Sequence, residues 1–89
     1  MKFNIKALGI ACGVIWGGAI LVTGLAGAIW PGYGQAFLDI VASVYPGYQG
    51  TPGIGQTVIG SLYGLVDGAV GGMIFAWLYN FAASKTAAA

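Results

Sequence analysis

Two long apolar runs, separated by a more polar segment, constrain this chain more than any other feature of its sequence. The first run extends from residue 7 to residue 29 without a charge, and the second, from about 57 to 81, contains Asp67. As a helix, the first run would be about 34 Å long, which is enough to cross the apolar core of a bilayer. Pro31 and Gly32 would end this helix, because proline cannot continue it and glycine turns the chain. We therefore predict two transmembrane helices, over about 7–29 and 57–81.

The composition excludes most functions of soluble proteins. Of the 89 residues, 58% are hydrophobic and only 6% are charged, whereas soluble domains average about 25% charged residues. The chain has one cysteine and no histidine or arginine, which disfavours metal sites, acid–base catalysis and nucleic-acid binding. We expect a single membrane domain over 1–89 with no catalytic residues, no metal and no cofactor.

The first run also has some features of a secretory signal peptide. Ala26-Gly27-Ala28 resembles a cleavage site, and two lysines precede the run. The run is, however, longer than the usual 7–15-residue apolar core of a signal peptide. We therefore expect it to remain as an uncleaved membrane anchor.

The positions of the charges predict an orientation in the membrane. Lys2 and Lys6 precede the first run and Lys85 follows the second, whereas the connection over 30–56 carries only Asp39. Loops rich in lysine and arginine stay in the cytoplasm. We expect a protein of the bacterial inner membrane with both termini in the cytoplasm and the connection outside.

The connection contains a short repeat, Trp30-Pro31-Gly32-Tyr33 and Tyr45-Pro46-Gly47-Tyr48. Pro-Gly suits the centre of a type II turn, and we interpret the two copies as helix stops rather than as a binding motif. Residues 34–44 between them place apolar side chains on one side of a helix; these are Phe37, Leu38, Val41 and Val44. The predicted fold is therefore an all-α membrane protein, a two-transmembrane helical hairpin with a short interfacial helix in the extracytoplasmic loop.

Small residues recur every four positions in both apolar runs. The predicted helix-packing residues are Gly9, Gly13 and Gly17, followed by Gly24 seven residues later, in the first run, and Gly60, Gly64, Gly68, Gly72 and Ala76 in the second. This spacing lets transmembrane helices approach closely. The second row sweeps about 160° around its helix, more than one neighbour is expected to cover. We therefore expect the hairpin to pack in the lipid bilayer against copies of itself, or against larger subunits of a membrane complex.

Asp67 is the only charged residue inside the predicted spans. A carboxylate at the bilayer centre costs about 2.5–3.5 kcal/mol on insertion scales. It could be stabilised structurally, by a hydrogen bond with a backbone carbonyl, Thr23, Tyr63 or the Trp16 N–H. It could instead be a proton or cation site, or a polar group lining a pore. We prefer the structural interpretation, because the chain offers no second ionisable group at that depth to form a relay.

Four segments support a family resemblance: residues 4–7 (Asn-Ile-Lys-Ala), Cys12 with Trp16-Gly17, residues 45–48, and Gly64-Leu65-Val66-Asp67-Gly68 continuing through Gly71-Gly72 to Phe75-Ala76-Trp77-Leu78-Tyr79-Asn80. In these the chain resembles short bacterial two-span membrane proteins labelled holin-like. The resemblance implies a self-assembling pore, holin-like or ion-conducting, with Asp67 near its lumen. Two-span holins usually end in a strongly charged tail, whereas residues 84–89 contain one lysine. Our preferred hypothesis is therefore a non-enzymatic accessory or scaffold subunit, with the pore as the alternative.

Overall fold

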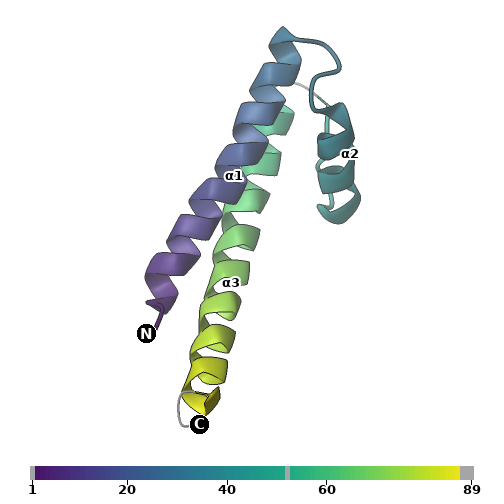
Figure 1. Ribbon diagram of the computed structural model, residues 1–89. Helices are drawn as coiled ribbons and strands as arrows, with labels where there is room; N and C mark the ends of the chain where they lie inside the picture. Colours follow the sequence, from purple (N-terminus) through teal and green to yellow (C-terminus); the bar gives the residue numbers. More distant parts are fainter. Residues whose placement is uncertain (1, 52, 87–89) are drawn as a thin grey trace.

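The computed structural model describes residues 2–51 and 53–86, and within these parts the fold is all-helical. Helices α1 (Ile5–Ile29) and α3 (Ile54–Thr86) form a long antiparallel hairpin, and the shorter α2 (Gln35–Val44) lies between them in sequence. Both ends of the chain lie at the same end of the hairpin (Figure 1). The molecule is elongated, with extents of 53 × 21 × 20 Å. By length and composition, α1 and α3 could each cross a membrane.

The long helices extend beyond the predicted spans for local reasons. Helix α1 begins two residues early because Asn4 caps it, its side-chain oxygen accepting a hydrogen bond from the Ala7 N–H at 3.0 Å; asparagine is among the best residues for this position. Helix α3 continues past residue 81 to Thr86. Neither glycine nor proline interrupts residues 82–86. The positive charge of Lys85 in the last turn also stabilises this end of the helix by its interaction with the helix dipole.

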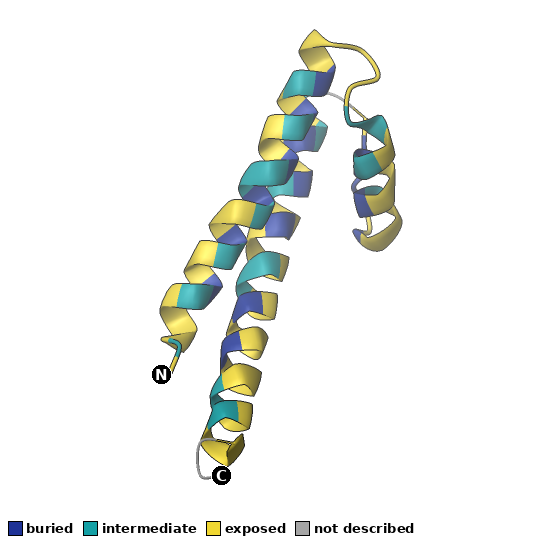
Figure 2. Cartoon of the chain, viewed as in Figure 1, coloured by how far each residue is buried: buried dark blue, intermediate teal, exposed yellow. Residues whose placement is uncertain are grey.

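Glycine backbones form the interface between α1 and α3. A Cβ added to Gly13 would lie 2.6 Å from the Leu65 carbonyl oxygen, and one added to Gly68 would lie 2.7 Å from the Cys12 carbonyl oxygen. Any larger side chain at these positions would therefore push the helices apart. Figure 2 shows the buried positions as a line where α1 faces α3, with exposed residues on the outer sides.

Helix α2, for which the sequence predicts an interfacial position, packs against the hairpin. It runs back beside the half of the hairpin that is farthest from the termini (Figure 1), and its apolar side faces α1 and α3. Leu38 and Val41 are buried there together with Ile20 of α1. The van der Waals contacts of these side chains hold α2 against the hairpin.

The segment after α2 returns along that helix to the start of α3. The Gln35 side chain donates a hydrogen bond to the Gly50 carbonyl oxygen at 2.9 Å, which joins the returning segment to the first turn of α2. Gly50 has a φ of +73°, and a Cβ there would lie 2.9 Å from the Leu38 carbonyl oxygen. Only glycine combines this left-handed backbone with so close an approach.

At the opposite end, Asn80 holds the start of the chain against α3. Its side chain accepts a hydrogen bond from the Phe3 N–H at 2.8 Å and donates one to the Phe3 carbonyl oxygen at 2.9 Å. The Phe3 ring also packs on Tyr79, with ring centroids 4.6 Å apart. These contacts close the hairpin at the end where the termini lie.

Candidate functional site

The candidate site lies where the end of α2 meets the middle of α3. Tyr45, the residue that caps the C-terminal end of α2, is only 6% exposed. Its ring stacks on that of Tyr63 in α3, with centroids 4.9 Å apart and an interplanar angle of 14°. The Tyr63 hydroxyl donates in turn to the Pro46 carbonyl oxygen. Two tyrosines and a proline therefore anchor the end of α2 to α3.

A chain of hydrogen bonds connects all three helices through the Tyr45 hydroxyl. The Trp16 indole Nε1–H donates to the Tyr45 oxygen at 2.7 Å, and the Tyr45 hydroxyl donates to Oδ2 of Asp67, also at 2.7 Å. Indole N–H groups only donate, so Trp16 occupies an acceptor position of the hydroxyl and leaves its one proton for Asp67. The direction of these two hydrogen bonds makes Oδ2 of Asp67 a hydrogen-bond acceptor.

Tyr45 is the partner that sequence reasoning missed. Among the candidates considered for Asp67, Trp16 takes part through Tyr45 rather than directly, and Tyr63 contributes ring stacking. Thr23 instead lies beside Gly34 at the start of α2. The sequence holds one signal that could have indicated Tyr45, namely its position four residues after Val41 on the apolar side of α2.

The two copies of the aromatic-Pro-Gly-aromatic repeat differ in role. The aromatic residues of the first copy, Trp30 and Tyr33, are 62% and 57% exposed. Those of the second copy, Tyr45 and Tyr48, are only 6% and 4% exposed. Both copies end a helix, but the second also supplies a functional group to the site.

Tyr48 covers the end of the glycine row nearest the connection. A Cβ added to Gly60 would lie 2.7 Å from the Tyr48 ring and 3.1 Å from Ile20. Burial raises the pKa of the Tyr48 phenol, and the negative charge of Asp39 raises it further. The hydroxyl therefore remains protonated over a wider pH range than that of a free tyrosine.

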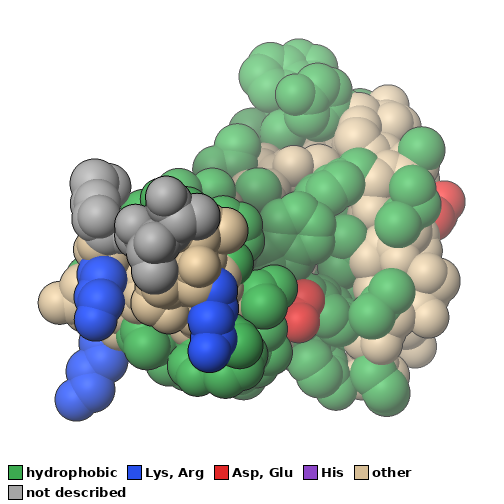
Figure 3. All heavy atoms as spheres, turned by 60° about the horizontal axis from the view of Figure 1, so that its bottom comes forward, with side chains coloured by type: hydrophobic (Ala, Val, Ile, Leu, Met, Phe, Trp, Pro, Cys, Tyr) green, Lys and Arg blue, Asp and Glu red, His purple; other side chains and the backbone are tan. Residues whose placement is uncertain are grey.

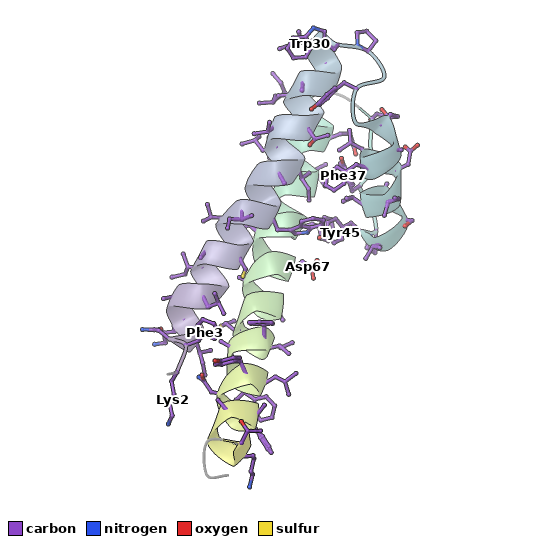
Figure 4. All side chains as sticks on the ribbon, viewed as in Figure 1. Lys2, Phe3, Trp30, Phe37, Tyr45 and Asp67 are labelled. Atoms are coloured by element: carbon purple, nitrogen blue, oxygen red, sulfur yellow. The ribbon has the colours of Figure 1, made fainter. Side chains whose placement is uncertain are left out.

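The Asp67 carboxyl faces a small hollow and not the α1–α3 interface. The hollow has a volume of about 130 Å³ and, apart from Asp67 and the Tyr45 hydroxyl, it is lined by apolar side chains; these are Trp16 of α1 and Phe37, Ile40, Val41 and Val44 of α2. Figure 4 shows Phe37 and Tyr45 directed from α2 toward the hairpin, with Asp67 on α3 beside Tyr45. No residue that lines this hollow is basic.

The lysines lie away from the site. Lys2 and Lys6 lie at or before the first turn of α1, and Lys85 lies in the last turn of α3. In Figure 3 the lysines gather at the end of the molecule that holds the termini. Lys85 is 18 residues after Asp67, about 27 Å along the helix. The described part of the chain therefore provides no lysine within α3 near Asp67.

The structure places the predicted helix-packing residues along the interface between the long helices. The buried ones are Gly9, Gly13, Gly17 and Gly24 of α1 and Gly60, Gly64, Gly72 and Ala76 of α3, while Gly68 is half-buried. Asp67, next to Gly68, is exposed. The structure thus brings the glycines together and leaves the carboxyl at the edge of their interface.

These contacts show which parts of the chain cover the α3 row. Helix α1 faces Gly64, Gly68 and Gly72, while Tyr48 and Ile20 cover Gly60. A row of residues four apart is inclined to the helix axis. A partner that crosses at the same inclination therefore follows the row instead of leaving it. Helix α1 and Tyr48 of the connection together cover the glycine row within the chain.

Comparison with known proteins does not assign the chain to a family. No protein-family model matches the chain, and neither a curated protein nor a solved structure matches it.

Proposed function

We propose that this chain is a small integral protein of the bacterial inner membrane, which acts as a non-enzymatic accessory or scaffold subunit of a membrane complex. One observation carries the proposal: small residues pack the hairpin internally, while large apolar side chains cover its exterior along its whole length. Ile10, Ile15, Val66 and Ile74, for example, are 65%, 71%, 63% and 59% exposed. Soluble monomers rarely expose contiguous apolar patches larger than a few hundred Å², so this exterior suits lipid and other membrane helices.

The exterior also retains places for close helix contact. Gly18 of α1 and Gly71 of α3 have open space where a Cβ would be. Small residues on exposed faces let a neighbouring membrane helix approach closely. These two glycines remain available to a partner after the hairpin has formed, which supports a packing role.

The proposed orientation places both termini in the cytoplasm. What supports it is the shared position of the two ends (Figure 1) together with the lysines gathered there (Figure 3). Cytoplasmic segments of membrane proteins carry an excess of lysine and arginine. The connection between α1 and α3 would then lie on the outer side.

In this orientation α2 enters the outer half of the bilayer beside the hairpin. Asp39, in the first half of α2, would lie near the headgroups, and Tyr45 would lie about 9 Å deeper. Asp67 is about 15 Å along α3 from Thr57, near the middle of a bilayer core of about 30 Å. Backbone groups at that depth must be satisfied internally, and there the Tyr45 N–H donates a hydrogen bond to the Val41 carbonyl oxygen at 3.1 Å.

Isolation from native membranes tests the proposal. The tagged chain would be cross-linked in intact cells, extracted in mild detergent and analysed by native mass spectrometry. We expect fixed amounts of larger, different subunits to accompany it. Recovery of the monomer alone after cross-linking would contradict the accessory role.

The second candidate function is a self-assembling pore, favoured by the exposed Asp67 carboxyl near the middle of α3. A pure homo-oligomer whose expression collapses the membrane potential would support this alternative. Asp67→Asn would then abolish conductance while leaving the oligomer intact. In an accessory subunit, the same substitution would leave the membrane potential unaffected.

A further inference from the structure

We propose that the hollow beside Asp67 receives a basic side chain, lysine or arginine, from a transmembrane helix of a different protein. This inference rests on the proposed accessory function and names the chemistry of the partner. The hollow is lined by residues of all three helices.

The hydrogen bonds leave half of the carboxyl available. Oδ2 of Asp67 accepts from Tyr45, whereas within residues 2–51 and 53–86 no hydrogen bond reaches Oδ1. The Tyr45 hydroxyl has no further proton to offer, because it has one and directs it to Oδ2. A carboxyl group at this depth calls for a hydrogen-bonding partner, and the free oxygen points to a donor from outside the chain.

The shape and lining of the hollow select the kind of donor. Its volume of about 130 Å³ is well above the minimum that holds one water molecule, which leaves room for a short alkyl chain. Its walls are apolar side chains around a single carboxyl. Lysine and arginine have this combination, an apolar stem that packs on apolar surface and a charged end that donates hydrogen bonds. A free metal ion would find one carboxylate and no group of three ligating side chains in the described residues.

The surface next to the hollow fits a helix. Gly71 lies four residues after Asp67 and therefore on the same face of α3. It is exposed, and a Cβ there would meet no atom within 4 Å. The backbone of a passing helix can therefore come close to α3 one turn from the carboxyl, within reach of a long side chain.

A second copy of this chain does not fit the site. A symmetric dimer through this face would place one Asp67 carboxyl against the other, and neither copy would offer the other a basic side chain there. The chain contains no arginine, and its lysines lie at or near the helix ends. The required cation therefore comes from a different protein.

Photo-crosslinking to designed helices tests this without knowledge of the native partner. The full chain would be reconstituted in phosphatidylcholine vesicles with polyleucine transmembrane peptides, each carrying a photoreactive leucine beside its central residue. The central residue would be lysine, arginine, acetyl-lysine, glutamate or leucine. Acetyl-lysine keeps most of the stem but removes the charge, and the protein stays unchanged in that comparison.

We expect the lysine and arginine peptides to crosslink at least ten times more than the leucine and acetyl-lysine peptides, at residues that line the hollow. Asp67→Asn and Asp67→Leu would remove this preference, and Asp39→Asn would keep it. Equal crosslinking of the lysine and acetyl-lysine peptides would overturn the inference. A preference for the glutamate peptide, crosslinks outside the hollow, or a preference that survives in both Asp67 variants would overturn it as well.

The native complex separates this inference from the proposed function. If larger subunits accompany both the wild-type chain and Asp67→Asn in equal amounts, the accessory role stands and the basic partner is refuted. If no subunit accompanies the chain while the lysine peptide still crosslinks, the proposed function fails and the chemistry of the hollow stands.

Discussion

Adding one methyl group at Gly13 should destabilise the hairpin, whereas the same change at Gly18 should not. An alanine Cβ at position 13 would lie 2.6 Å from the Leu65 carbonyl oxygen and 3.2 Å from the Ala69 Cβ, closer than the usual 3.5–4.0 Å contact between carbon atoms. The Leu65 oxygen is a backbone atom and cannot move aside by changing a rotamer. The helices must therefore separate by about 1 Å at this point, and such overpacking typically costs about 1–3 kcal/mol.

Gly18 provides a matched control on the same helix. It lies next to Gly17 but has no atom within 4 Å of its added Cβ. Gly18→Ala should therefore gain up to about 1 kcal/mol from helix propensity. The two variants should differ in free energy of unfolding by the steric cost alone, about 2 kcal/mol at the middle of that range, since both have the same gain in propensity.

Titration with sodium dodecyl sulfate in mixed micelles, followed by near-ultraviolet circular dichroism, measures this difference. Cys12, the single cysteine, is half-buried next to Gly72 of α3. Its rate of thiol labelling gives an independent measure of how often the helices separate. We expect labelling about 30-fold faster in Gly13→Ala than in Gly18→Ala, from 1.4 kcal/mol per factor of ten. Equal stability and equal labelling would refute the glycine interface.

Four further outcomes follow from the site and from the two ends of the hairpin. Tyr45→Phe keeps the ring but leaves Trp16 and Asp67 without their shared partner, so we expect a loss of about 1–3 kcal/mol on the same titration; Tyr33→Phe, at an exposed tyrosine, should be neutral. Thr57→Val should be neutral or stabilise by about 1 kcal/mol, because the buried Thr57 hydroxyl has no hydrogen-bond partner in the described residues; a loss of more than about 1 kcal/mol would contradict this. Asn80→Leu removes both hydrogen bonds to Phe3, so hydrogen exchange should quicken at the Phe3 amide and stay unchanged at the amides of α2. The pKa of Tyr48 is raised, so at high pH the folded chain keeps a proton that the unfolded chain loses. The free energy of unfolding should therefore be constant below about pH 10 and fall above it. Tyr48→Phe should reduce that fall, and an equal fall in both proteins would show that Tyr48 does not cause it.

The helices and the glycine positions could be predicted from the sequence because they depend on local order. The length of an apolar run determines whether it can cross a bilayer, and four-residue spacing places Gly64, Gly68 and Gly72 on one side of any helix. The errors at the ends are equally local. Asn4 caps α1 before the apolar run begins, and the polar residues 84–86 continue α3 because none of them breaks a helix.

The position of α2 could not be predicted, because periodicity shows that a helix has an apolar side but not what covers it. The side formed by Leu38 and Val41 suits a membrane surface as well as the side of the hairpin. Tyr45 meets Asp67 only because α2 folds back, so no spacing in the sequence connects these residues. A helical wheel likewise shows the angle of the α3 glycine row but not which segment covers each part of it, so the contact of Tyr48 with Gly60 could not be predicted.

The hydrogen bond from Tyr45 also connects two events at opposite ends of α2. A group that binds the free oxygen of Asp67 also changes the carboxyl that accepts the hydrogen bond from Tyr45, at the C-terminal end of α2. The hydrogen bond from Gln35 to Gly50 holds the N-terminal end of the same helix. By thermodynamic reciprocity, an occupant that favours the docked α2 must bind more tightly when α2 is docked. A molecule that binds the connection near Gly50 and favours the docked α2 would therefore raise the affinity of the Asp67 carboxyl for its occupant, and the occupant would raise the affinity for that molecule by the same factor. In this way the chain could transmit a signal from the outer connection to the middle of its helices without moving α1 against α3.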